Sequence, residues 1–361
     1  MEGRRSLTRT PRIRNSASNG APNYIGKCRS AARYRRSYGT GLTPLEGQTP
    51  GIKLTSIRIP TDRELPKHRD LTEKVNPEQL SLLIKKEWRL SYVTPLYRFK
   101  HTHLKSYSRQ LSAFIAAEKQ KGTAVEVGPE TGFKVTFSTV LGLTESDEDT
   151  EAVFIQIRSR PPFAQEGAPD VVVWSGWLAC VNGNAEYIGS LPVDFTCLPL
   201  FCASGAESLT SLVQSWLRNS FDCNFGQLGI SSSNLKWLAA MWTGCQPAVN
   251  IRYLKLSWTL PARPPLDVSY TIHPRDAWDL WSSIHQEKDR MSAEEVNLFM
   301  RCIESNFFRH FRVHLSAGEL VKVSTAVGSA HRDGKIKFLN CDYMSSILAL
   351  LTESALFMMP I

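Results

Sequence analysis

The stretch VVVWSGWLACV at residues 171–181 decides the fold, because it is a continuous apolar run of β-branched and aromatic side chains. Such a run predicts a buried strand. Further along, Ser204-Gly-Ala-Glu207 has the spacing of a helix capping box, so we expect a helix to begin there. A second apolar helix is predicted near residues 233–243. The region 171–242 is therefore predicted to form the core of a folded domain.

Alternating and helical patterns continue on both sides of this core. Period-two alternation predicts strands at 133–138, 266–272, 311–315, 321–325 and 336–338, and residues 153–157 are predicted to form another strand. Helical periodicity predicts helices at 76–88, 103–121, 274–284, 292–307 and 341–358. Strands that follow one another, with helices interspersed, predict an α+β fold with a curved, largely antiparallel sheet and flanking helices.

Three local signals refine this prediction. Ser292-Ala-Glu-Glu295 has the spacing of a capping box, which marks a helix start. Asp333-Gly334 predicts a hairpin. After Tyr253 the apolar phase of a long strand slips by one residue, which predicts a β-bulge and therefore a bend in the sheet.

The positive charge of the chain is concentrated at its amino terminus. The 361 residues carry a net charge of +9, and residues 1–40 contain ten Lys and Arg but a single acid, Glu2. The remaining residues hold 33 basic and 33 acidic side chains, so they are neutral together. We expect residues 1–70 to be a disordered Arg-rich tail, and three interpretations stay open for it: a solubilising segment, a nuclear-import or nucleic-acid-binding arm, or a mitochondrial targeting segment.

The folded region is predicted to span 71–361. We expect N-terminal helices and strands at 71–170, and a core sheet with a C-terminal dimerisation region at 171–361.

The motifs of the common enzyme classes are missing. The sequence has no GxGxxG after a strand, no GxxxxGK[ST], no HExxH and no GxSxG. The eight cysteines form no CxxC pair, and most lie among apolar neighbours, which favours reduced and buried thiols. His310 and His314 are four residues apart, but the predicted helix-to-strand change near Phe311 separates them. We therefore expect no catalytic residue, no metal site, no cofactor and no small-molecule substrate. No apolar run reaches the roughly 18 residues that a membrane span requires, so no membrane partner is expected.

Two groups of basic side chains suggest contact with a polyanion. One group extends along residues 85–121, and the other lies on the outward face of the carboxy-terminal strands, where period two gathers its members on one side. A solvated face is the plain alternative, and neither group looks able to recognise base sequence. The candidate DNA-binding residues are Lys85, Lys86, Arg89, Arg98, Lys100, Lys105, Arg109, Arg312, Lys322, Lys335 and Lys337.

The last predicted helix has two apolar stripes instead of one. A single stripe can pack on the sheet, so the second indicates either deep burial or a protein partner. The candidate interface residues are Val321, Val323, Tyr343, Leu350 and Phe357.

Several segments, in the same order, resemble one known family. They are TPLYRF (94–99), FTCLPLFCASGAES (195–208), NLKWLAAMWTGC (234–245) and RHFRVHLSAGELVKVSTAVGSAHRDGKIK (309–337). From about Val75 to the carboxy terminus the chain resembles the vertebrate centromere protein L family. No single motif of that family assigns a contact residue, so the candidate residues above come from pattern alone.

The resemblance implies a nuclear, non-enzymatic scaffold subunit of the inner kinetochore, within the constitutive centromere-associated network. Members of the family pair with CENP-N, which engages the CENP-A nucleosome, and the pair contacts CENP-C and the CENP-H/I/K/M subunits. The resemblance also implies a curved sheet, a basic groove for DNA shared by the pair, and a role in kinetochore assembly and chromosome segregation. The alternative hypothesis is a mitochondrial nucleic-acid-binding protein directed by the Arg-rich segment.

Overall fold

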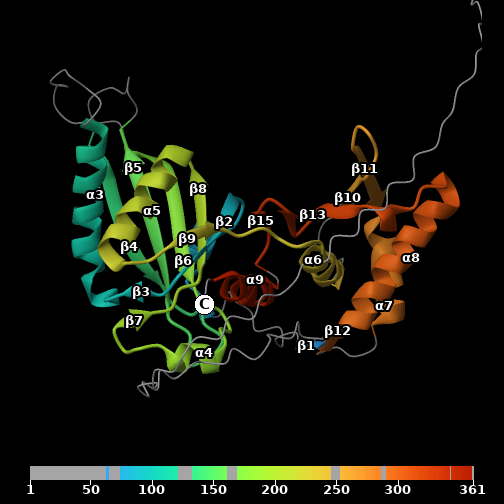
Figure 1. Ribbon diagram of the computed structural model, residues 1–361, viewed down its shortest axis with the longest axis horizontal. Coiled ribbons are helices and arrows are strands. Elements are labelled where there is room, and N and C mark those ends of the chain that lie inside the picture. Colours follow the sequence, from blue (N-terminus) through green and yellow to red (C-terminus); the bar gives the residue numbers. More distant parts are fainter. Residues whose placement is uncertain are drawn as a thin grey trace, which may run out of the picture. The chain divides into compact units, whose positions relative to one another are not determined.

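An eleven-stranded sheet organises the structure, a computed structural model (Figure 1). The residues that it describes are 62–64, 74–120, 132–160, 169–244, 253–285, 290–341 and 343–359. All of them lie within one unit, Ser56–Ile361.

The strands of the main sheet follow the order β11-β10-β13-β14-β15-β2-β8-β6-β5-β4, and β9 also pairs with β2. In chain order they are β2 (Glu87–Val93), β4 (Lys134–Val140), β5 (Ala152–Ser159), β6 (Val171–Ala179), β8 (Leu200–Gly205), β9 (Phe225–Gln227), β10 (Leu254–Leu260), β11 (Leu266–Ile272), β13 (Glu319–Ser324), β14 (Gly328–His331) and β15 (Lys335–Phe338). Two short pairs complete the strands, β1 (Asp62–Glu64) with β12 (Arg290–Ser292), and β3 (Leu96–Tyr97) with β7 (Phe195–Thr196). Every pairing in this description is antiparallel, which confirms the predicted fold class.

Helices cover parts of both faces of the sheet. They are α2 (Pro77–Leu83), α3 (Leu104–Gln120), α4 (Ala185–Ser190), α5 (Glu207–Phe221), α6 (Ser232–Gly244), α7 (Pro274–Ile284), α8 (Ala293–Phe311) and α9 (Met344–Met358), with 3-10 turns η1 (His101–His103) and η2 (Leu315–Ala317). On one face, α3 and α5 pack against β4, β5, β6 and β8. On the other face, α9 contacts β2 and β8, and α6 contacts β13 and β14.

Strand β6 shows why the run at 171–181 has no alternation of apolar and polar residues. Trp174 and Leu178 belong to the core beneath α3 and α5, whereas Trp177 and Ala179 belong to the core on the α9 side. From Trp174 to Ala179 both faces of β6 are covered, so both sets of side chains must be apolar, whereas Val171, Val172 and Val173 at the start of the strand are exposed.

Some predicted local elements are confirmed. The Ser292 and Glu295 capping box is present in full at the start of α8. Asp333-Gly334 lies in the hairpin between β14 and β15, where Gly334 has φ +77°. Asn76 caps α2, and its side chain accepts a hydrogen bond from the backbone N–H of Glu78.

The predicted capping box at Ser204 and Glu207 is wrong. Ser204 is part of β8 and pairs with Ser175, while the residue before α5 is Ala206, which has no capping side chain. The helix itself is present, and Glu207 provides the acidic side chain of its first turn.

The predicted strand at 311–315 is also wrong. Helix α8 continues to Phe311, whose ring lies 4.5 Å from that of Phe307 one turn earlier, and Arg312 then ends the helix with φ +57°. The short 3-10 turn η2 follows instead of a strand.

A register shift between β10 and β13 marks a bulge in this part of the sheet. It is in β13, where Ser257 of β10 pairs with Lys322 and the next residue, Trp258, pairs with Leu320. Val321 is the extra residue, so the buried side chains of β13 are Leu320 and Val323. The earlier part of the predicted long strand, residues 249–252, lies outside the described residues.

Two observations bear on the predicted division of the chain. Residues 62–64 form β1, and the rest of the predicted 1–70 tail lies outside the described residues. Strand β2, from the predicted 71–170 subregion, lies between β8 and β15 of the 171–361 subregion. The sheet therefore interleaves the two subregions.

The side chain of Asp149 connects the loop at residues 145–149 with the loop at residues 182–183. Its buried carboxylate accepts hydrogen bonds from the backbone N–H groups of Glu145, Ser146, Asn182 and Gly183, at 2.7 to 3.0 Å. A charged acceptor that satisfies four backbone donors leaves all four unsatisfied when it is removed.

We expect Asp149→Ala to lower the free energy of unfolding by about 3 kcal/mol, because four part-buried backbone hydrogen bonds lose their carboxylate acceptor. Urea denaturation monitored by circular dichroism measures the change. Asp147→Ala, at an exposed position of the same loop, is the matched control, with an expected change within about 0.5 kcal/mol. Equal losses in the two variants would contradict the assigned role of Asp149.

Candidate nucleic-acid interface

The pairing of β2 with β15 joins distant parts of the chain. Its register matches Arg89 with Lys335, Trp88 with Ile336 and Glu87 with Lys337. The backbone N–H of Lys85 donates to the Phe338 carbonyl at 2.6 Å, and that of Leu90 donates to the Gly334 carbonyl at 2.7 Å. Since successive side chains of a strand point to opposite faces, this pairing fixes which of them face the solvent.

Trp88 secures this pairing from the core side. Its indole is fully buried, lies edge-on to Trp177 and donates from Nε1 to the Leu83 carbonyl at 2.7 Å. Ile336 and Phe338 of β15 are buried on the same face. Consequently Arg89, Lys335 and Lys337 project from the opposite face.

A row of basic side chains crosses the sheet on that opposite face. The register pairs Arg89 with Lys335, Lys335 with His331, and His331 with Lys322, over β2, β15, β14 and β13. A neighbouring row contains Lys337 and, three strands further on, Lys255. We call this surface the basic platform and define it as Arg89, Lys255, Lys322, His331, Lys335 and Lys337. Arg89 and Lys322 are exposed, and the other members are half-buried.

Acidic side chains lie around the platform. Glu207 forms an ion pair with Arg89, and Asp333 Oδ2 lies 3.2 Å from His331 Nδ1. Glu319 accepts from Arg332 at 2.6 Å, and Glu87 is the register partner of Lys337. The face is therefore basic along its central row and mixed at its margins.

The other predicted basic residues lie elsewhere. Lys105 and Arg109 are exposed on α3, which packs against β4 at the far end of the sheet. The guanidinium group of Arg98 lies over the Tyr97 ring at 4.9 Å, and Lys100 is exposed just before η1. The structure therefore separates this group from the platform.

Three further residues of that prediction are not on the platform. Lys86 Nζ donates to Ser175 Oγ at 3.2 Å on the core side of the sheet, where burial lowers the pKa of Lys86. Arg312 ends α8, with its guanidinium 5.8 Å from the Phe308 ring, because the expected strand does not form. Lys85 is exposed in the turn before β2.

Sequence reasoning missed three residues of this surface. Lys255 alternates with the buried Leu254 and Leu256 and could have been found by the same period-two argument. His331 becomes visible only through the register of β14. Glu207 was interpreted as part of a capping box, and nothing in its local sequence indicates its proximity to Arg89.

The predicted interface residues fall into two groups. Val323 and Leu350 are 0% and 1% exposed inside the chain's own core, so neither offers a surface to a partner. Most of α9 is buried in the same way, which accounts for its two apolar stripes. Val321 and Tyr343 are half-buried, and Phe357 is 60% exposed beside the exposed Met358.

The described residues contain no group of three or more His, Cys, Asp or Glu side chains placed to hold a metal ion. Six cysteines in this part of the chain are free thiols, and burial raises the pKa of Cys202 and raises that of Cys223 to about 12. Such thiols are poor nucleophiles at neutral pH. Among the described helices, none is both long enough and apolar enough to span a bilayer.

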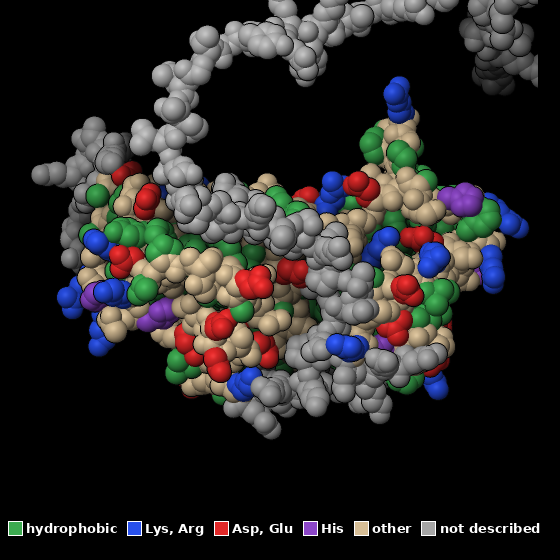
Figure 2. Space-filling model, turned by 60° about the horizontal axis from the view of Figure 1, so that its bottom comes forward, with side chains coloured by type: hydrophobic (Ala, Val, Ile, Leu, Met, Phe, Trp, Pro, Cys, Tyr) green, Lys and Arg blue, Asp and Glu red, His purple; other side chains and the backbone are tan. Residues whose placement is uncertain are grey.

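In the view of Figure 2, turned by 60° from that of Figure 1, Asp and Glu side chains lie among the Lys and Arg side chains. On that view the described side chains form no broad basic patch. The fold and its surface thus define an α+β protein whose distinctive feature is a partly uncovered sheet face with a basic centre.

Comparison with known proteins assigns the family. The family model described as centromere protein L matches residues 82–356. Centromere protein L of Danio rerio is 57% identical over 366 residues, which covers 100% of this chain and 95% of the relative. The Homo sapiens and Gallus gallus proteins of that name are 45% and 44% identical, and each alignment covers more than 90% of both chains.

The chain belongs to the centromere protein L family. This membership gives it a nuclear location at the centromere and kinetochore, and a role in chromosome segregation. It also decides against the mitochondrial alternative.

The hairpin that presents Lys335 depends on Gly334. A Cβ atom at this position would lie 2.1 Å from the Leu228 carbonyl oxygen, and φ is +77°. We therefore expect Gly334→Ala to lower the free energy of unfolding by about 2 kcal/mol or more, measured by urea denaturation.

Gly189 provides the control for this variant. A Cβ atom there meets nothing within 4 Å, and the residue lies in α4, so Gly189→Ala is expected to be neutral or slightly stabilising. A Gly334→Ala protein as stable as Gly189→Ala would contradict the steric argument.

Proposed function

We propose that the chain is a non-enzymatic scaffold subunit of the inner kinetochore. In this proposal it forms a heterodimer with CENP-N, helps the pair to bind CENP-A chromatin and centromeric DNA, and links CENP-C and the CENP-H/I/K/M subunits. Family membership supports the kinetochore role. The row of basic side chains across β2, β15, β14 and β13 carries the DNA-binding part of the proposal.

The geometry of the row suits a phosphate backbone. Adjacent strands lie about 4.8 Å apart, so the row from Arg89 to Lys322 extends for about 14 Å across the sheet. Charges spread in this way attract phosphates with little dependence on base sequence. The platform therefore favours binding to DNA backbone, with sequence specificity left to other parts of the assembly.

The acidic side chains at the margins of the platform suggest that the chain binds DNA together with a partner. Glu87, Glu207, Glu319 and Asp333 reduce the net charge of the surface, so we expect the isolated chain to bind a duplex weakly. A partner that supplies its own cations would complete a groove. This expectation agrees with a subunit that acts as part of a pair.

Lys335→Glu combined with Lys337→Glu is expected to weaken duplex binding by the full chain in complex with CENP-N. It should also reduce the slope of log affinity against log salt concentration by about 2, because two phosphate contacts are lost. Fluorescence anisotropy with a labelled duplex at several salt concentrations measures both quantities. An unchanged slope would leave the platform as an ordinary solvated face.

Lys105→Glu combined with Arg109→Glu distinguishes the two basic surfaces. These residues are exposed on α3, away from the platform, and the substitution makes the same change in charge. We expect a much smaller loss of affinity than for the platform variant. A larger loss would move the DNA contact to α3.

The partner surface is proposed at Phe357, at the end of α9, and Tyr343 and Val321 stay separate candidates elsewhere on the chain. Phe357→Asp is expected to reduce co-purification with CENP-N, because the exposed ring would lose apolar contact with the partner, while far-UV circular dichroism stays unchanged. Leu350→Asp is unsuitable for this test, since it would place a charge in the core. Full pairing by the Phe357 variant would exclude this end of α9 from the interface.

A further inference from the structure

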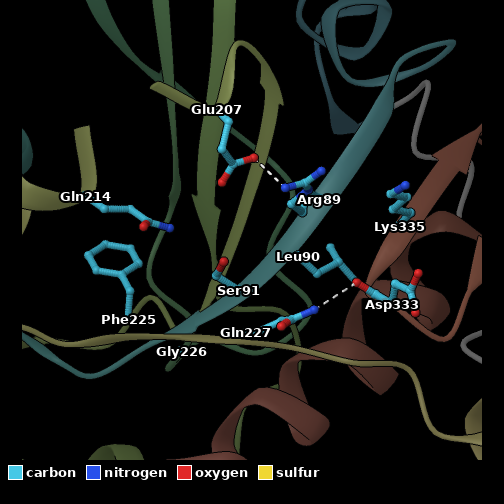
Figure 3. A pocket seen from close by; sticks show the side chains of 10 residues that line it. All are labelled: Arg89, Leu90, Ser91, Glu207, Gln214, Phe225, Gly226, Gln227, Asp333 and Lys335. Atoms are coloured by element: carbon cyan, nitrogen blue, oxygen red, sulfur yellow. Dashed lines mark hydrogen bonds and ion pairs between the residues drawn. The ribbon is translucent and has the colours of Figure 1, made fainter. Parts of the chain in front are cut away.

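A polar pocket lies at one end of the basic row (Figure 3). Its volume is about 440 Å³, and its lining includes Arg89, Ser91, Glu207, Gln214 and Lys335. Figure 3 shows Glu207 reaching from the start of α5 toward Arg89, with Lys335 on the far side of the Arg89 side chain. The pocket is therefore lined by two cations of the platform and by two carboxylates. Glu207 pairs with Arg89, and Asp333 lies beside His331.

Two forces hold Glu207 in this position. The residue lies in the first turn of α5, where the helix dipole favours a negative charge. The N-cap residue, Ala206, provides no side chain that could satisfy the backbone N–H groups of this turn. The Glu207 carboxylate also pairs with the Arg89 guanidinium. The side chains of Glu207 and Arg89 are 64% and 52% exposed, so solvent weakens the pair and a competing anion can replace it.

We propose that Glu207 is an internal competitor for nucleic acid. Its carboxylate occupies the position beside Arg89 that a phosphodiester group takes when the platform is bound. This inference rests on the proposed function of the platform and adds a residue that sets its affinity.

The chemistry of the pocket supports the exchange. Guanidinium groups pair with carboxylate and phosphate in the same bidentate geometry, so one anion can substitute for the other. A phosphodiester can also reach the Lys335 ammonium group. Within the described part of the chain, the Ser91 hydroxyl and the Gln214 amide have no hydrogen-bond partner, and both can donate to phosphate or sugar oxygens.

The test is Glu207→Gln in the full chain, in complex with CENP-N, titrated with a labelled duplex of arbitrary sequence. Glutamine keeps the shape of the side chain and removes its charge. We expect binding to tighten by about two- to fivefold at low salt, which is the range that an exposed ion pair can supply. The slope of log affinity against log salt concentration should stay about the same, because Arg89 contacts one phosphate in the bound state of both proteins.

Glu294→Gln is the matched control. Glu294 is an exposed acidic residue in the first turn of α8, so the variant has the same change in charge at an equivalent helix position away from the platform. It should leave affinity and slope unchanged. An equal gain in both variants would mean that net charge alone is responsible, and would overturn the inference.

Arg89→Ala tests whether Glu207 acts through Arg89. In that background Glu207→Gln should give little further gain in affinity, and a full gain would contradict the proposed exchange.

The experiments distinguish failure of the platform proposal from failure of the Glu207 proposal. If the Lys335 and Lys337 variant binds as tightly as the parent, the platform function itself is lost; if it binds weakly but Glu207→Gln changes nothing, only the role of Glu207 is lost.

Discussion

The pairing of β2 with β15 is the constraint on which the rest of the structure depends. It brings residues 87–89 beside residues 335–337, which are about 250 positions later in the chain. The buried Trp88 fixes the face on which β2 alternates, because an indole of this size cannot be turned to solvent without loss of its contacts with Trp177 and Leu83. The outward position of Arg89 follows from that choice, and so does the basic row.

Several local features could be predicted because neighbouring residues determine them. The apolar run at 171–181, the capping box at Ser292 and the hairpin at Gly334 are examples. The strand that contains Trp88 could not be predicted from neighbouring residues. The spacing of Trp88 from Leu80 and Leu83 fits a helix, yet α2 stops at Leu83 and Trp88 lies in a strand, since the distant β15 provides a pairing edge that no short window contains.

Some residues of the candidate site could likewise be predicted from local sequence, whereas others could not. Lys322, Lys335 and Lys337 were predicted on one face from period-two alternation within their own strands. Arg89 joins them only through long-range pairing, and Arg312 does not, because α8 continues past the predicted strand start. For the partner surface, the amount of apolar sequence in α9 was a poor guide, since Leu350 is used by the chain's own core.

The most direct test of the account is the chemical reactivity of individual lysines, measured by acetylation and mass spectrometry with and without duplex DNA. If the basic row is one binding surface, duplex should reduce the labelling of Lys322, Lys335 and Lys337 and leave that of Lys105 on α3 unchanged. Protection of Lys105 with no change at the three platform lysines would contradict the account.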